Sequence, residues 1–555
     1  MGKIGLDTQQ GLYLGIDFGT THSVVSFFNE NTGETQTIPI DGANVFPTAV
    51  QFESDPDDET KLSRVFGTQA KEAAIIFPEA TVLSVKRLLG SDEKVTITVD
   101  EKEFAFTPEQ IAGEILGYIK QRADDFAQEE WGISGEFTGC VLTVPANATD
   151  KQKSKTKEAA VLAGFAPESI FLRPEPAAAA IDYAVSAPAN KTVLVYDFGG
   201  GTFDACLLDI TQDATGEPTL AIAATYGDNR LGGDDIDKVI MDMVYAEFQQ
   251  LAAIDLFDDN ADDGVSARQK KMARMRLQQA ATQAKERLSQ AQSTKIQLAP
   301  FIQEPKIVNI NMEITREMFY AHRRTHALGD TPDTFAALEN QNIHDLVNRT
   351  ITCIDLCLQA AQTPEESVDE VIMVGGSSAL LPAVEAVAKK FGKAPFTARI
   401  SPALSISQGA AQYAHIILTP GVRGPVVQEM TLHPLGLEIA GRRFLEIVPA
   451  GRPIPPEGLT VSAAEPLVTN FDHVASMAIV VYEDTAPVPG DTPLVSREGM
   501  KRLAGTTLRG IPQAPKGQEK VQVTFRVGQD NLLTVEAQSL SQSGTATTLA
   551  VDGLY

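Results

Sequence analysis

The chain has 555 residues and carries 46 lysines and arginines against 73 aspartates and glutamates, which gives a formal net charge of −27. That length predicts three or four folding units, with ample chain to bury their cores. The large excess of acid argues against nucleic acid or an anionic membrane as the main partner.

The cysteines are too few for a disulfide framework, and no histidine or cysteine stands at metal-ligand spacing from them. We expect Cys140, Cys206, Cys353 and Cys357 to be reduced residues of the core. Met1 to Gln10 lacks the long apolar segment of a signal peptide, and no stretch reaches the length of a membrane span. These features predict a cytoplasmic protein.

The first pattern with functional content is Gly15-Ile16-Asp17-Phe18-Gly19-Thr20-Thr21. An apolar run ends in an aspartate, a glycine turn with threonines follows, and a second apolar run covers Ser23 to Phe28. This pattern predicts a β-hairpin. Taken alone, such a segment is most often an ordinary turn.

Residues 11–185 have the pattern of a first α/β lobe. Further strands are predicted at Ala49 to Phe52 and Gly139 to Val144, and helices at Pro108 to Asp125 and Asp150 to Ala163. A helix of small residues begins near Pro176, since proline suits the first helical turn. Glu175 at its start is either a helix cap or a partner of water and metal.

A second hairpin is predicted around Val195 to Asp204, with the sequence VYDFGGGTFD. Gly199, Gly200 and Gly201 let the backbone approach a polyphosphate and direct its N–H groups inward. Aspartates repel phosphate and need a cation between them, and magnesium is typically held by carboxylates together with phosphate oxygens. The two aspartate-tipped hairpins together predict a site for Mg-ATP or Mg-ADP between two similar lobes.

The second lobe is assigned to residues 192–420. It contains a glycine turn that leads into a helix near Asp237, a helix from Ala267 to Gln292 expected to be exposed, and a strand from Val371 into the turn at Gly375 and Gly376. That turn allows a planar base to lie against bare backbone, although a plain strand-to-helix connection explains the same residues.

After a linker at 421–429, residues 430–555 show short alternating strands, clearest from Val521 to Val527 and from Leu533 to Ala537. The predicted fold is therefore a two-lobed α/β domain at 11–420 followed by an antiparallel β-sandwich. The chain ends without a helical segment after the sandwich, and we expect no α-helical lid.

The order of these motifs, ending with LRGIPQAPKG at 508–517, resembles the 70-kDa heat-shock chaperone family of the DnaK type over residues 11 to 550. The resemblance implies an actin-like ATPase that binds ATP or ADP with Mg²⁺ and couples slow hydrolysis to the binding of unfolded or nascent polypeptides. It also implies a J-domain co-chaperone and a nucleotide exchange factor as partners.

The resemblance assigns roles to individual residues. Asp17 and Asp197 would hold hydrated magnesium, Lys86 and Glu175 would act on the attacking water, and Asp204 would orient it. The nucleotide-binding residues carried over by motif are Gly19, Thr20, Thr21, Gly199, Gly200, Gly201, Thr202, Gly232, Gly233, Lys285, Ser289, Gly375, Gly376 and Ser377. From its own sequence context, Lys86 reads as a surface lysine.

Several positions depart from the family pattern. The arginine that commonly stacks on adenine is missing from Ser378-Ala379-Leu380, Thr282 replaces a glutamate, and Lys153 replaces an arginine that forms bidentate contacts. The linker keeps only a short apolar patch around Val426 and Val427, which predicts weaker or differently carried coupling between the domains.

Two expectations concern the sandwich. Phe444, Val461, Met477 and Ile479 either line a peptide cleft or belong to the core. An extended peptide in such a cleft gains affinity from main-chain hydrogen bonds. With no lid, we expect peptides to exchange quickly.

Two other functions remain open from the sequence. One is a noncatalytic scaffold that binds nucleotide structurally and acts on a J-domain partner. The other is a small-molecule kinase of the actin-like superfamily, in which the C-terminal β domain would have no role.

Overall fold

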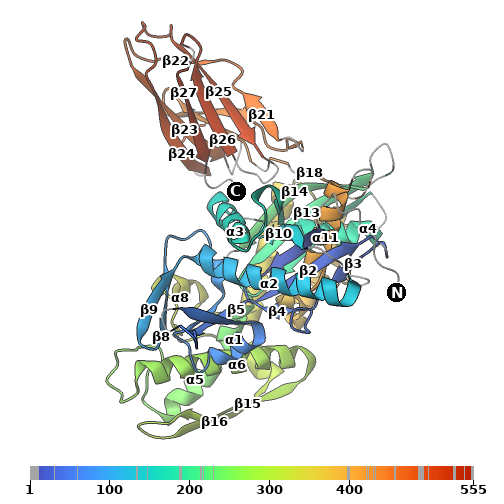
Figure 1. Ribbon diagram of the computed structural model, residues 1–555, viewed down its shortest axis with the longest axis vertical. Helices are drawn as coiled ribbons and strands as arrows, with labels where there is room; N and C mark the ends of the chain where they lie inside the picture. Colours follow the sequence, from blue (N-terminus) through green and yellow to red (C-terminus); the bar gives the residue numbers. More distant parts are fainter. Residues whose placement is uncertain are drawn as a thin grey trace.

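The structure is a computed structural model of the chain (Figure 1). It describes residues 12–30, 32–58, 61–132, 136–146, 148–186, 190–212, 216, 218–228, 230–396, 401–419, 422, 424, 426–428, 430–431, 433–455, 458–484, 493–497, 499–528, 533–542 and 544–551.

Each lobe is built on a sheet that carries one of the two expected hairpins. In lobe I the strand order is β11-β10-β1-β2-β3, and β4 also pairs with β2. In lobe II the order is β17-β12-β13-β14-β18. The lobe I strands are β1 (Leu12–Phe18), β2 (His22–Asn29), β3 (Glu34–Thr37), β4 (Phe46–Pro47), β10 (Phe137–Val144) and β11 (Ile170–Pro174). The lobe II strands are β12 (Lys191–Phe198), β13 (Phe203–Gln212), β14 (Pro218–Asp228), β17 (Glu370–Val374) and β18 (Val426–Gln428).

The two sheets have the same arrangement of strands around their hairpins. In each, an antiparallel hairpin, β1–β2 or β12–β13, lies beside a parallel strand, β10 or β17. The central strands are nearly continuous apolar runs and are buried on both faces, as parallel sheets covered by helices require. Asp17 and Asp197 stand near the carboxyl ends of β1 and β12, so each lies where the parallel strands of its sheet end.

Two helices fill the space between the sheets. Helix α4 (Glu175–Ser186) packs on β12 and β13, and α11 (Ser405–Leu418) packs on α4, β1 and β2. Small residues permit this approach, since a side chain at Gly15 would collide with the backbone of Ala411. Ser26 and Ser407 also share a hydrogen bond of 2.8 Å. Helix α11, from the end of the range predicted for lobe II, thus also contacts the lobe I sheet.

The outer part of lobe I completes a separate core. It contains β5 (Ala49–Ser54), β6 (Leu62–Phe66), α1 (Gly67–Ala73), β7 (Thr81–Leu83), the 3₁₀ turn η1 (Val85–Leu88), β8 (Val95–Val99), β9 (Lys102–Phe106), α2 (Pro108–Trp131), α3 (Asp150–Leu162) and η2 (Pro167–Ser169). The sequence predicted that this helix would end at Asp125, and α2 ends six residues later, at Trp131.

The outer part of lobe II lies at the end of the molecule opposite the sandwich (Figure 1). It contains α5 (Gly233–Leu251), α6 (Ala267–Gln290), β15 (Ser293–Ile302), β16 (Val308–Thr315), α7 (Arg316–Ala321), α8 (Pro332–Leu338) and α9 (Ile343–Ala360). The turns η3 (Glu365–Ser367) and η4 (Gly376–Ala379) and helix α10 (Leu381–Phe391) follow.

Helix α6 is not the fully exposed element that its composition suggested. Ala273, Leu277, Ala281, Ala284 and Leu288 lie one helical turn apart or nearly so and are buried in the lobe II core. Composition alone does not show this apolar face, because polar residues separate its members along the sequence.

The acidic run at Asp258 to Asp263, which its composition alone would suggest to be a solvated loop, is tied to a buried lysine. Lys270 is fully buried and donates to the carbonyl oxygen of Asp258 and to a carboxylate oxygen of Asp263, both at 2.7 Å. The acidic loop is therefore organised around a buried ammonium group.

The C-terminal part is a β-sandwich of two antiparallel sheets, drawn in orange and red in Figure 1. Its first sheet has the order β20-β19-β23-β24 and its second β21-β25-β26-β27, with β22 paired to β25. The strands are β19 (Leu435–Ile439), β20 (Arg443–Val448), β21 (Leu459–Ser462), β22 (Leu467–Val468), β23 (Ser476–Asp484), β24 (Met500–Arg509), β25 (Lys520–Val527), β26 (Leu533–Ser539) and β27 (Ala546–Val551). Alternate residues of β25 and β26 point into one apolar core.

The linker forms a strand on lobe II. Strand β18 pairs in parallel with β14, with Thr219, Leu220 and Ala221 opposite Val426, Val427 and Gln428. The backbone of this short segment thus docks on the edge of the lobe II sheet, although the remainder of the predicted linker lies mostly outside the described residues.

None of the helices described by the structure is both long and apolar enough to cross a membrane. All four cysteines are buried and free, as predicted.

Candidate functional site

Four carboxylates gather where the two hairpins meet. Asp17 is the second-last residue of β1, and Glu175 follows β11 at the same edge of the lobe I sheet, because β1, β10 and β11 run parallel. In lobe II, Asp197 stands near the end of β12 and faces Asp204 across the hairpin. The four groups are close enough that the charge of Glu175 acts on the other three.

Lys86 supplies a cation to this carboxylate cluster. It lies in η1 of lobe I, and its ammonium group donates to a carboxylate oxygen of Glu175. The side chains of Lys86 and Glu175 are only 9% and 10% exposed. Burial lowers the pKa of Lys86, but Glu175, Asp17 and Asp197 outweigh it, so that the pKa is raised overall. The residue that sequence context suggested to be at the surface is buried and charged.

One lysine does not neutralise the cluster. Burial, followed by repulsion from Glu175, raises the pKa of Asp17 to about 7 and that of Asp204 to about 8. The pKa of Asp197 is also raised, by burial and then by Glu175, Asp204 and Asp17. One buried oxygen of Asp197 and one of Asp204 lack a hydrogen-bond partner in the described part of the chain. The arrangement therefore favours an added cation.

The cluster suits a hydrated cation. Among the described residues, no group of three or more histidine, cysteine or acidic side chains is arranged to hold a metal directly. Asp17 accepts a hydrogen bond of 3.3 Å from Thr143, which orients one of its oxygens. Magnesium usually keeps several waters and takes one or two carboxylates together with phosphate oxygens, and Asp17 and Asp197 fit this coordination.

The glycine hairpin of lobe II packs against the start of α5. The N–H groups of Gly233 and Asp234 donate to the carbonyl oxygens of Gly199 and Gly200, at 3.0 and 2.8 Å. A side chain at position 232 would collide with the carbonyl of Gly200, so this contact requires glycine.

The two hairpins also face each other directly. A methyl group added at Gly200 would lie 2.8 Å from the side chain of Thr21 in lobe I. Thr20, Thr21 and Thr202 are half-buried at the turns, and a side chain at Gly19 would collide with the backbone of His22. The structure thus brings the threonines and glycines of both predicted turns together beside the carboxylates.

The helix α6 residues are placed unequally. Lys285 donates to the carbonyl of Gly233 at 2.9 Å and pairs with Asp237 at 2.8 Å. Thr282, which replaces the family glutamate, donates to the other oxygen of Asp237 at 2.7 Å. Ser289 instead donates back to the carbonyl of Lys285 at 3.1 Å. Lys285 therefore reaches the site, while the hydroxyl of Ser289 turns back onto its own helix.

The double-glycine turn after β17 closes the site on the lobe II side. Gly375 has a φ of +82°, and a side chain there would lie 2.5 Å from the carbonyl of Phe198 and 2.8 Å from a carboxylate oxygen of Asp197. Ser377 donates to the carbonyl of Gly199 at 2.8 Å. No atom would lie within 4 Å of a side chain at Gly376. Bare backbone is thus available at Gly376, where a planar base would lie.

Arg87 is a site residue that the sequence analysis missed. Its guanidinium, in lobe I, pairs with Asp234 of lobe II at 3.0 Å and lies against Gly201. No local sequence signal marks it, because its partner Asp234 belongs to the other lobe. Arg87 thus forms an ion-pair bridge between the two lobes beside the glycine turn of lobe II.

Because the Arg87 side chain is 38% exposed, we expect its bridge to contribute modestly, about 1 kcal/mol or less. Replacing Arg87 with alanine should speed dissociation of ADP by roughly twofold to fivefold, with little change in the rate of hydrolysis. Stopped-flow release of a fluorescent ADP analogue measures this. An unchanged release rate would show that the bridge does not restrain the lobes.

The four cleft candidates in the sandwich are not brought together as one group. Ile479 is buried in the sandwich core, and Val461 and Met477 pack against that core. Phe444 lies in a separate small cluster with Tyr482 and Val495. Their positions fit core packing more simply than a shared cleft.

Comparisons with known proteins agree over nearly the whole chain. The family model described as "Hsp70 protein" matches residues 13–325 and 333–552. The chaperone protein DnaK of Thermotoga petrophila is 34% identical over 552 residues, covering 98% of this chain and 80% of the relative. That of Thermosipho melanesiensis is 31% identical over 558 residues, covering 99% of this chain and 82% of the relative.

Proposed function

The chain belongs to the Hsp70 protein family and is an ATP-hydrolysing chaperone, and we propose that it binds Mg-ATP and Mg-ADP between its two aspartate-tipped hairpins. The observation that carries this proposal is the group of four buried carboxylates with Lys86, which has more negative charge than one lysine offsets.

Asp17 and Asp197 are proposed to hold magnesium through its water shell, because they come from the two lobes and are close enough for the charge of Asp17 to raise the pKa of Asp197. Bound magnesium would supply charge neutralisation for the phosphate oxygens. Mutual repulsion and burial raise the pKa values of the carboxylates in this cluster. A bound cation would offset that repulsion and allow all of them to ionise.

Lys86 and Glu175 are proposed to position the attacking water. The ammonium group of Lys86 donates to Glu175. This contact holds the group in place, and its other N–H groups are proposed to donate to the water. Asp204 faces Asp197 across the hairpin and orients the same water from lobe II. Phosphoryl transfer depends mainly on positioning and charge stabilisation, and these three residues provide both.

The backbone of the two turns is proposed to receive the phosphates. Gly199, Gly200 and Gly201 have no side chains of their own, so a phosphate can approach their backbone. The N–H of Gly199 already donates to the carbonyl of Thr202 at 3.1 Å, so the N–H groups of Gly200 and Gly201 are the proposed donors, together with the hydroxyl groups of Thr20 and Thr202. Lys285 and the Gly375–Gly376 turn are proposed to bind the nucleoside, since Lys285 contacts the start of α5 at Gly233 and Gly375 lies against Phe198 and Asp197 at the end of β12.

We propose that strand β18 carries the signal between the nucleotide site and the sandwich. It pairs with β14, whose other neighbour β13 forms the glycine hairpin. Two strand positions can be tested separately, because alternate N–H groups of a strand point to opposite sides and only one side faces β14.

Of the substitutions Val427→Pro and Gln428→Pro, one should remove a β18–β14 hydrogen bond and the other should not. We expect the damaging one to reduce peptide-stimulated ATP hydrolysis about threefold or more, toward the basal rate, and the other to serve as its control. Steady-state hydrolysis with and without an unfolded peptide gives the comparison. Equal stimulation in both variants and in the parent would exclude a coupling role for this strand.

The proposed partners are unfolded or nascent polypeptides, a J-domain co-chaperone and a nucleotide exchange factor, acting in the cytoplasm. Single-turnover ATP hydrolysis, measured alone, with a J-domain protein and with an unfolded peptide, tests the whole proposal. We expect slow basal hydrolysis and acceleration by both additions. Nucleotide binding without any hydrolysis would favour the noncatalytic scaffold instead.

A further inference from the structure

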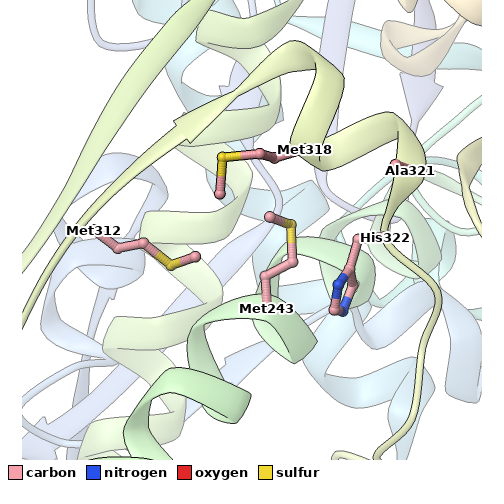
Figure 2. Close-up of a pocket in the computed structure, with 5 residues that line it drawn as sticks. All are labelled: Met243, Met312, Met318, Ala321 and His322. Atoms are coloured by element: carbon pink, nitrogen blue, oxygen red, sulfur yellow. The ribbon is translucent and has the colours of Figure 1, made fainter.

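Away from the nucleotide site, lobe II contains a cavity of about 360 Å³ lined by methionines and a histidine. Met243 comes from α5, Met312 from β16, Met318 and Ala321 from α7, and His322 follows α7 directly. Figure 2 shows the thioether ends of the three methionines converging on one space, with the His322 ring beside Met243.

Ordinary core packing accounts for only part of this methionine cluster. Met243 is 6% exposed, as a core residue would be, but Met318 is 41% exposed. Methionine fills irregular apolar gaps, and it is also a soft ligand for monovalent copper. Three thioethers from three elements at the rim of an open cavity match the second role.

His322 is held in a defined orientation. Its Nε2 lies 2.7 Å from Asp242, whose side chain is fully buried and also accepts from the N–H groups of Thr325 and His326. This contact occupies Nε2 and orients the imidazole ring.

The second nitrogen of His322 is consequently available. Nδ1 is the ring nitrogen that does not face Asp242, and within the described residues it has no hydrogen-bond partner. A carboxylate that orients a histidine through its other nitrogen is the usual outer-shell arrangement of histidine metal ligands. The negative charge of Asp242 would also balance a monovalent cation among neutral ligands.

The cavity lies beside a departure from the family. The Hsp70 family model stops matching at residue 325 and resumes at 333. The chain in and around this break is anchored on α5, because Asp330 pairs with the fully buried Arg324 at 2.7 Å and also with Lys238. The segment between residues 325 and 333 also contacts Asp242, the partner of His322, because the N–H of His326 donates to it at 2.7 Å.

We propose that Met243, Met312, Met318 and Nδ1 of His322 form a binding site for a soft monovalent cation of the Cu(I) class. This site is independent of the proposed nucleotide site. It uses neutral thioether and imidazole ligands, which favour Cu(I) over the hard cations Mg²⁺ and Ca²⁺.

Silver(I), which does not change its oxidation state during the titration, is the probe. The full chain carrying ¹³C-labelled methionine methyl groups is titrated with Ag(I) and followed by NMR. We expect one equivalent to shift the methyl resonances of Met243, Met312 and Met318 and to leave those of the other methionines in place. Unmoved resonances, or binding only at the cysteine thiols, would overturn the proposal.

The double variant Met312→Leu, Met318→Leu keeps the apolar volume and removes two thioethers, so its Ag(I) affinity should fall at least tenfold. Met500→Leu, in the sandwich, is the matched control and should bind as the parent does. Both variants should retain ATP hydrolysis, which separates this site from the nucleotide site. If the double variant fails to fold, the methyl shifts of the parent protein decide the question alone.

Discussion

Replacing Lys86 with alanine is expected to slow single-turnover ATP hydrolysis by about 10²- to 10³-fold. The ammonium group of Lys86 contacts Glu175 and offsets the charges of Asp17 and Asp197. In phosphoryl transfer, such a group acts by placing the nucleophile and stabilising developing charge, so its loss affects the rate more than it affects binding. The affinity for Mg-ADP should therefore change by less than about tenfold.

The control for this substitution is Lys151→Ala. Lys151 is also a lobe I lysine paired with an acid, but its partner Asp92 is 92% exposed and the pair lies on the surface. We expect the Lys151 variant to hydrolyse ATP at the parent rate. Quenched-flow measurement of both variants at saturating ATP separates the roles, and a Lys86 variant within threefold of the parent rate would show that the lysine is structural.

The second large effect concerns Asp197. In the absence of magnesium and nucleotide, Asp197→Asn should stabilise the protein by on the order of 1 kcal/mol, because it removes a buried charge repelled by Glu175, Asp204 and Asp17. In the presence of Mg-ADP the parent should be more stable than the variant. The parent gains stability from the bound ligand, and the variant loses the carboxylate that attracts the cation.

Thermal unfolding in EDTA and in Mg-ADP tests this reversal. Asp209→Asn serves as the control, since Asp209 lies on β13 away from the turn and accepts a hydrogen bond from Thr192 at 2.7 Å. We expect Mg-ADP to stabilise this control as it does the parent. An Asp197 variant that is less stable than the parent in EDTA and equally stabilised by Mg-ADP would contradict the role of this carboxylate.

Much of the fold followed from local sequence patterns. The two hairpins, the buried strands and the start of α4 at Glu175 are set by apolar runs and by glycine and proline, whose effects are local. The burial of α6 was missed because its apolar stripe is diluted by polar residues, and only the tertiary core shows which face is covered. Helix α11 and its packing on β1 and β2 were not predicted, since packing between distant segments leaves no local signal.

The candidate site was predictable in its residue types but not in its electrostatics. The aspartates and glycines stood in recognisable patterns, and the family resemblance supplied Lys86. Nothing local indicates that Lys86 is buried or that it contacts Glu175, 89 positions away. Arg87 was missed for the same reason, because its partner Asp234 belongs to the other lobe. The Met243 cavity combines three elements and had no sequence pattern at all.

The most direct test of the account is calorimetric titration of the full chain with ADP and with ATP, in magnesium and again in EDTA. If Asp17 and Asp197 hold a hydrated cation against the phosphates, each nucleotide will bind with measurable heat in magnesium and much more weakly in EDTA. Binding of equal strength in both buffers, or no heat with either nucleotide in magnesium, would contradict the account.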